Sequence, residues 1–199
     1  MMPELKIIYT KNNELGRLDF TLSKLDYYKS QDIKVSLPTD FEVTTSLDRL
    51  RVIVDSEYPN NKALKAKDEI SKSWVLHRGE ISVYLGSMPF RKIGLINLQL
   101  TQYGTAGSYN AKTNTIIINT NFGVDLLSIL VHELTHIVVE ARIVKKFNLE
   151  HQQKENLVKW LITSSPALAS FIEVPAREPI KAPQKEVLSE LKLLGYSSL

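Results

Sequence analysis

Cysteine is absent from the 199 residues of the chain. Disulfide bonds are therefore excluded, and so are metal sites built from thiolates. A metal ion bound by this protein must be held by histidine and carboxylate side chains. The chain has four histidines, so two of them at a defined spacing would rarely arise by chance.

Long apolar segments are also lacking. No uncharged apolar stretch approaches the roughly 20 residues of a membrane-spanning helix, and the start, MMPELKIIYTKNNELG, has no signal-peptide core. We therefore expect a cytoplasmic protein with no membrane partner. Export by a route without a classical signal, or removal of a leader, stays open.

Charge of one sign is not concentrated anywhere. The formal net charge is +3, and no run of lysine and arginine exceeds two residues. These features give no support to nucleic-acid binding, so we expect no nucleic-acid partner. The hydrophobic and charged fractions, 43% and 24%, are those of a globular protein with one domain and at most a small appendage.

The first third of the chain predicts extended segments and then helices. LKIIYT and DIKVSLP favour strands, so residues 1–45 are expected to form an N-terminal extended or β segment. Apolar residues at helical spacing follow Thr45 or Ser46, and Pro59 ends that helix. A second helix begins near Asn61, and its end stays open because EISVYLG also suits a strand.

The middle of the chain predicts a small sheet. KIGLINLQLTQY alternates apolar and polar residues, YNAKTN has hairpin-turn chemistry, and TIIIN is β-branched. Residues 92–120 are therefore expected to form a three-stranded antiparallel meander. With the helices around it, the fold class is α+β.

A nearly all-apolar helix is expected to begin near Asp125 and to end at Asn148. A second helix, residues 149–162, follows after a short turn. We take residues 46–163 as the main domain. Residues 164–199 form a proline-rich arm and a terminal helix, because four prolines precede KEVLSELKLLGY.

Ionisable side chains interrupt the apolar helix at His132, Glu133 and His136. Burying a polar group without a partner costs about 2–7 kcal/mol, so each needs an interaction. A single histidine there would most often have a hydrogen-bond partner in the core. Two histidines four residues apart lie on one helix face, about 5–6 Å apart, from which both imidazoles can reach one ion. Glu133 lies ~100° round the helix and suits a general base.

A catalytic zinc site needs a third protein ligand. Glu140 is excluded because eight residues of helix rise about 12 Å. In a helix that folds back antiparallel, Glu155 lies nearest the histidines, with 18 residues between it and His136. Glu155 is therefore favoured, and Glu150 and His151 remain alternatives.

HELTH followed by this glutamate resembles the gluzincin metallopeptidases, the group that contains thermolysin and the zinc aminopeptidases. The resemblance covers residues 93–163, and the metzincin pattern is excluded by Val139 and Arg142. It implies a zincin-like fold in which a small antiparallel or mixed sheet precedes the motif helix and the ligand-bearing helix. It also implies substrate binding by the hairpin, at Gly107, Ser108 and Tyr109.

The chain departs from that family at two points. Thermolysin-like enzymes place an aspartate four residues after the third ligand, where this chain has Lys159. Gluzincins also use a downstream histidine or tyrosine to stabilise the oxyanion. The candidates here, between which the sequence does not choose, are Tyr103, Tyr109, His151 and Tyr196.

The functional hypothesis is a zinc-dependent endopeptidase with one Zn²⁺ per chain and a peptide or protein substrate. His132, His136 and Glu155 would hold the metal, and Glu133 would be the general base. The alternative is a zincin-like module that binds zinc and a partner peptide without cleaving it.

Overall fold

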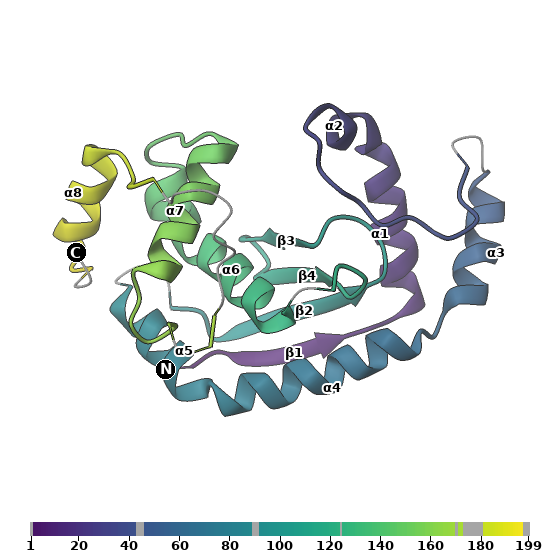
Figure 1. The fold of residues 1–199 in the computed structure, drawn as a ribbon, viewed down its shortest axis with the longest axis horizontal. Helices are drawn as coiled ribbons and strands as arrows, with labels where there is room; N and C mark the ends of the chain where they lie inside the picture. Colours follow the sequence, from purple (N-terminus) through teal and green to yellow (C-terminus); the bar gives the residue numbers. More distant parts are fainter. Residues whose placement is uncertain are drawn as a thin grey trace.

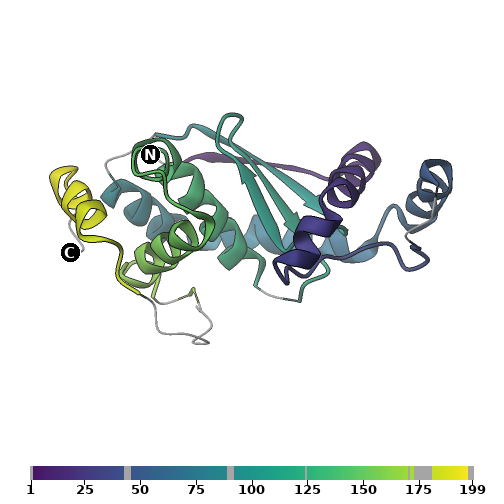
Figure 2. The ribbon, with the colours of Figure 1, turned by 90° about the horizontal axis from the view of Figure 1, so that it is seen from above.

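The computed structural model describes residues 2–42, 46–88, 92–123, 125–169, 171–172 and 181–196. Figure 1 shows an elongated molecule in which α8 and α3 lie at opposite ends, and Figure 2 shows the same arrangement from above. The elements in chain order are β1 (Glu4–Ile8), α1 (Lys11–Ser23), α2 (Leu25–Ser30), α3 (Leu47–Glu57), α4 (Asn61–Leu76), α5 (Arg78–Ser87), β2 (Leu95–Thr101), β3 (Gly107–Asn110), β4 (Thr115–Asn119), α6 (Leu126–Val139), η1 (Glu140–Val144), α7 (His151–Thr163) and α8 (Lys185–Leu193).

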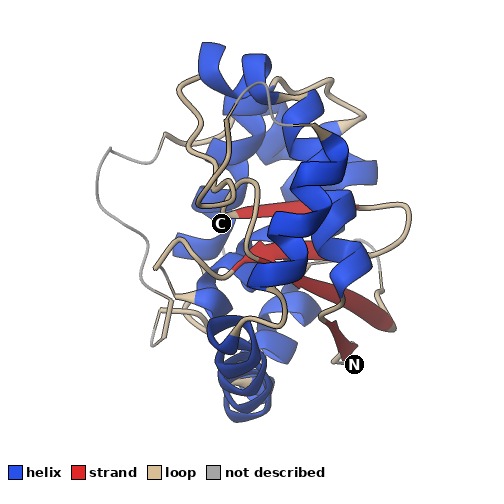
Figure 3. Ribbon diagram, turned by 90° about the vertical axis from the view of Figure 1, so that its right-hand side faces the viewer, coloured by secondary structure: helices blue, strands red, loops and turns tan. Residues whose placement is uncertain are grey.

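A four-stranded mixed sheet lies at the centre, in the order β1-β2-β4-β3. Strand β1 pairs in parallel with β2, β2 pairs in parallel with β4, and β3 forms an antiparallel hairpin with β4. Figure 3, viewed along the long axis, shows helices above and below the strands, and the strand beside the N-terminus at the edge of the molecule. The α+β class is confirmed, with a mixed sheet and helices.

The antiparallel meander predicted for residues 92–120 is wrong in one respect, because β2 and β4 are parallel. The loop between β2 and β3 crosses the end of β4 and is held there. The backbone N–H of Asn119 donates to the carbonyl of Ala106 at 2.9 Å, and its side-chain amide donates to the carbonyl of Gly104 at 2.9 Å. Strand β4 therefore lies between β2 and β3.

One face of the sheet is covered by helices. Alternate residues of β2 and β4 are fully buried on this face: Ile96, Leu98, Leu100, Ile116 and Ile118. Helix α6 packs over β3 and β4, while α4 lies beside α6 and β2. The main core fills the space between this face and helices α4 to α7, and α8 joins it through Val187 and Leu191.

The N-terminal part is more helical than predicted. Strand β1 agrees with LKIIYT, but helices α1 and α2 lie within the segment expected to be extended. The N-cap of α1 is Thr10, whose side chain accepts a hydrogen bond from the backbone of Asn13 at 3.3 Å. Helix α1 packs against α3 around a second, smaller core that contains Leu18 and Val54.

The helices of residues 46–163 agree better with those predicted from the sequence. Ser46 caps α3 by accepting from the backbone of Arg49, while Thr45 lies outside the described residues. EISVYLG, left open above, is helical in α5. Asn148, with φ 47°, lies in the turn that joins α6 and η1 to α7. Much of the proline-rich arm, residues 173–180, lies outside the described part of the chain.

Across the described ranges, we find no helix with the length and apolar character that a membrane crossing requires.

Candidate metal centre

Helix α6 brings the two histidines of the motif onto one face. Asp125 caps the helix, and its carboxylate accepts from the backbone N–H of Leu127 and Ser128 at 3.2 and 2.9 Å. One turn separates His132 from His136. The side chain of His132 is partly exposed at 24%, whereas that of His136 is almost fully buried at 2%.

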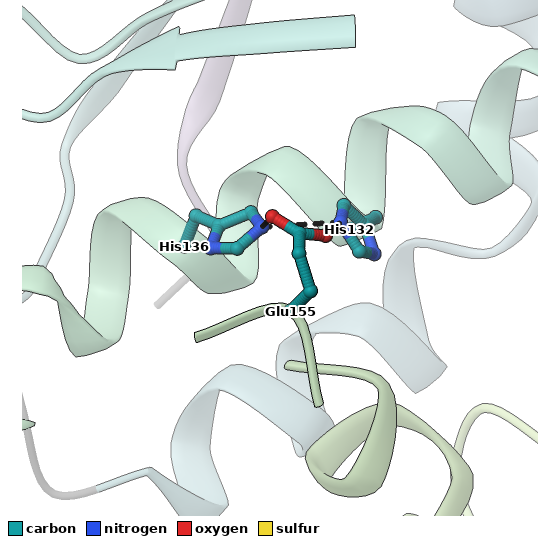
Figure 4. Close-up of side chains that lie close together, drawn as sticks. All are labelled: His132, His136 and Glu155. Atoms are coloured by element: carbon teal, nitrogen blue, oxygen red, sulfur yellow. Dashed lines mark hydrogen bonds and ion pairs between the residues drawn. The ribbon is translucent and has the colours of Figure 1, made fainter. Parts of the chain in front are cut away.

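Helix α7 supplies a carboxylate to the same place. The Oε2 of Glu155 lies 3.1 Å from the Nε2 of His132, and its Oε1 lies 3.1 Å from the Nε2 of His136. The two histidine Nε2 atoms are themselves 3.1 Å apart. Figure 4 shows the carboxylate of Glu155 between the two imidazole rings. Three potential metal ligands therefore converge from two helices.

The arrangement fits a zinc ion. Tetrahedral zinc with bonds of about 2.0–2.1 Å places its ligand atoms about 3.3–3.4 Å apart. The observed separations of 3.1 Å among the three side chains approach that value. Two imidazoles and one carboxylate are also a ligand set that catalytic zinc uses. The identity of the metal is part of the proposal below.

The other acidic and histidine candidates lie elsewhere. Glu150 is the N-cap residue of α7, and His151 is the first residue of that helix and is exposed. Neither belongs to the group of close ligand atoms found among the described residues. Glu140, excluded above on helix rise, accepts a hydrogen bond from the hydroxyl of Tyr109 at 2.7 Å.

Glu133 points to the sheet side of the same helix. It is 8% exposed and lines the cleft together with His136 and Glu155. Burial raises the pKa of Glu133 to about 7. The positive charges of Lys154 and Arg17 act in the opposite direction. A carboxyl group with such a pKa can both take and give a proton near neutral pH.

Gly107 of β3 lies directly against Glu133. A Cβ atom at this position would be 2.4 Å from the Oε1 of Glu133 and 2.8 Å from the Cγ2 of Ile129. A larger residue here would therefore force the side chains of Glu133 and Ile129 to move. Gly107 and Tyr109 pair with Ile118 and Ile116, so they share the helix-covered face of the sheet.

Arg17 and Thr105 hold this part of β3 and were not identified from the sequence. The Nη2 of Arg17 donates to the hydroxyl of Thr105 at 2.9 Å, and that hydroxyl donates to the carbonyl of Gly107 at 2.9 Å. Arg17 is 6% exposed and comes from α1, far away in the chain. Arg17 lies on a segment that was expected to be extended, so the sequence did not indicate its contact with Thr105.

Tyr109 connects the metal ligands to the hairpin. Its ring stacks on that of His136, with centroids 4.9 Å apart and an interplanar angle of 6°. Burial and the hydrogen bond to Glu140 raise the pKa of Tyr109, so its hydroxyl stays protonated. The ammonium of Lys154 lies 5.2 Å from the centroid of the same ring. Lys154 is a third residue whose role the sequence did not identify.

The four residues considered for stabilising an oxyanion differ in whether they line the cleft. The hydroxyl of Tyr103 donates to Glu57 at 2.6 Å in the second core, and that of Tyr196 donates to the carbonyl of Leu161 at 3.3 Å. Both are therefore engaged away from the cleft. Tyr109 and His151 line the cleft.

With Lys159 in place of the aspartate described above, one ring nitrogen of a motif histidine lacks a hydrogen-bond partner among the described residues. The Nδ1 of His136 is buried and has no hydrogen-bond partner. Ligand histidines usually donate from the second ring nitrogen to a carboxylate or carbonyl. No such acceptor for His136 was found in the described part of the chain.

His136, Glu155, Glu133 and Tyr109 border one open cleft of about 580 Å³. Its wall on the sheet side is the edge strand β3, including Gly107, Ser108 and Tyr109. The side chain of Ser108 alternates to the opposite face of the sheet, beside Ile117.

Comparison of the chain with protein-family models, with curated proteins and with solved structures gives no significant match.

Proposed function

We propose that the protein is a zinc-dependent endopeptidase. The observation that carries this proposal is the convergence of three ligand atoms, all within 4.8 Å of one another, beside the buried carboxyl group of Glu133. Metal ligands alone would suit a structural site. A neighbouring base in an open cleft favours hydrolysis instead.

The metal would be held by His132, His136 and Glu155. When bound, zinc supplies a Lewis acid that polarises water and the scissile carbonyl. Three protein ligands leave a coordination position for reactants, as in other catalytic zinc sites. This ligand set supports zinc over magnesium or calcium, which prefer oxygen ligands.

Glu133 would be the general base. Its carboxylate takes a proton from the attacking water and then gives that proton to the nitrogen of the leaving amine. The contact with Gly107 limits where the carboxylate can lie. The linkage from Arg17 through Thr105 to Gly107 fixes the strand that makes this contact.

A peptide would bind along β3. This strand is at the edge of the sheet, and an extended peptide can pair with such an edge through its backbone. Gly107, Ser108 and Tyr109 border the cleft at that edge. The proposed substrate is therefore an extended segment of peptide or protein.

A second candidate function is zinc-dependent binding of a peptide without cleavage. It is favoured by His136, whose Nδ1 has no acceptor. Loss of such a partner lowers metal affinity or activity by about 10- to 100-fold in zinc enzymes. The site would then serve recognition only.

The test measures zinc content and hydrolysis of denatured casein for the parent and for Glu133→Gln. We expect about one zinc per chain in both, and a loss of hydrolysis by orders of magnitude in the variant. Glu186→Gln, at an exposed position on α8, is the matched control and should match the parent. One zinc per chain without hydrolysis by the parent would favour the binding function, and loss of zinc in Glu133→Gln would refute the role as base.

A further inference from the structure

Three lysines line the cleft. Lys154 lies over the ring of Tyr109, with its ammonium 5.2 Å from the ring centroid. Lys112 belongs to the hairpin turn that follows Tyr109, and Lys145 follows the π-helical turn whose first residue, Glu140, binds the tyrosine hydroxyl. Three separate elements thus direct positive charge to the cleft.

These ammonium groups are not held in close ion pairs within the described part of the chain. Lys11 and Lys146, which lie outside the cleft, pair with carboxylates at 2.5 and 2.7 Å. The lysines of the cleft are therefore available to a bound molecule.

The acidic residues of the cleft are already engaged. Glu155 contacts both histidines, Glu140 accepts from Tyr109, and Glu133 is buried against Gly107. None of these carboxylates forms a close ion pair with the three lysines among the described residues. An anionic group of the ligand would form such a pair.

We propose that the cleft selects acidic peptide segments, with a glutamate or aspartate of the substrate bound by Lys112, Lys145 and Lys154. This proposal rests on the proposed function, because a peptide paired with β3 would carry its side chains past these lysines. We place the acidic residue on the side of the scissile bond toward Lys112, which lies in the hairpin turn after the end of β3.

Binding is tested in the zinc-loaded chain carrying Glu133→Gln, so that the probe is not cut. The probes are two labelled peptides of equal length, one alternating glutamate and serine and the other glutamine and serine. Fluorescence anisotropy should show about tenfold or tighter binding of the glutamate peptide at low salt, with the difference shrinking as salt is added. Equal binding of the two peptides would overturn the proposal.

The lysines are then replaced by glutamine. Each single change should weaken binding of the glutamate peptide by a factor of about 1.5 to 5, and the triple change should remove most of the preference. Lys159→Gln, on the same helix α7 but outside the cleft, is the matched control and should leave the preference intact. A preference that survives the triple change would assign it to another surface.

A labelled single-stranded DNA of similar length separates an acidic peptide from a nucleic acid. Tighter binding of the DNA than of the glutamate peptide would replace the peptide proposal by a nucleic-acid one.

Mapping the casein bonds cut by the parent chain separates the proposed preference for acidic substrates from the proposed peptidase activity. Hydrolysis without acidic residues enriched on one side of the cut refutes the substrate preference alone, whereas charge-dependent binding without hydrolysis refutes only the peptidase.

Discussion

At the scale of single residues, the contact between Gly107 and Glu133 makes the sharpest prediction. Gly107→Ala would place a methyl group 2.4 Å from the Oε1 of Glu133. The carboxylate must move, so casein hydrolysis should fall by about 10- to 100-fold, because small displacements of a catalytic group cost that much. Zinc content should not change, since Gly107 does not contact the ligands. Gly94→Ala, which meets no atom within 4 Å, is the control, and an equal loss in both variants would contradict this account.

Glu155 and His151 give a second prediction at this scale. Glu155→Ala should abolish hydrolysis and weaken zinc binding strongly. The loss of affinity should exceed the roughly 10- to 100-fold that follows removal of a group hydrogen-bonded to a metal ligand. His151→Ala and Glu150→Ala should have little effect on zinc affinity, because neither side chain belongs to the ligand group. Competition with a chelator at fixed pH measures all three. If His151→Ala released the metal while Glu155→Ala retained it, the ligand set would be three histidines.

At the scale of elements, Glu14 joins helix α1 to the end of β2. It is fully buried, and its Oε2 accepts from the hydroxyl of Thr101 at 2.6 Å and from the backbone of Gln102 at 3.1 Å. Burial raises the pKa of Glu14 despite these hydrogen bonds. The folded protein therefore favours the protonated acid, and the unfolded chain releases that proton at a lower pH.

Because of this difference, Glu14 should make the protein less stable as the pH rises above the ordinary range of a glutamate. Its contribution to stability is complete in acid and is lost as the pH rises through the raised pKa. Glu14→Gln should remove this dependence, since the amide oxygen can accept the same hydrogen bonds. Urea unfolding at a series of pH values measures it. Parallel curves for parent and variant above pH 5 would show that Glu14 does not titrate in this way.

The sequence predicted elements best where local signals agree with the tertiary structure. The spacing of His132 and His136 on an apolar helix, and the return of Glu155 on the next helix, needed only helix geometry and one short turn. These residues do come together in the structure. The site beyond them depends on Arg17 and Lys154, whose roles arise from long-range packing that periodicity does not report.

Helix α1 shows why the rest was not predictable. Its two asparagines and Gly16 have low helix propensity, and its buried residues include Glu14 and Arg17. Charged residues turned inward disrupt the apolar pattern from which a helix is identified. The parallel pairing of β2 with β4 was missed for a related reason, because consecutive strands usually lie side by side.

At the scale of the whole molecule, a bound metal would join α6 to α7 and so stabilise the folded state. Adding a chelator to the zinc-loaded protein should therefore lower the melting temperature. Protons compete with the metal for the imidazole nitrogens, and burial lowers the pKa of His136 below the usual histidine value of about 6.5. The chelator-sensitive part of the melting temperature should thus be large at pH 7 and small only well below the usual histidine pKa, at about pH 4. An equal shift at both values would place histidine ligation in doubt.

The pairing of β1 with β2 also sets an order of events during folding. Residues 4–8 have to wait for residues 95–101 before they acquire a partner strand, and closing so long a loop is entropically costly and slow. The β3–β4 hairpin and the α6–α7 pair, by contrast, form between neighbours in the chain. We therefore expect the three ligands to assemble first, and Arg17 to reach Thr105 only when the N-terminal segment docks. Pulse-labelled hydrogen exchange should show protection of α6 before β1, so that the nascent protein would complete the proposed metal site before the carboxylate of Glu133 is fixed in place.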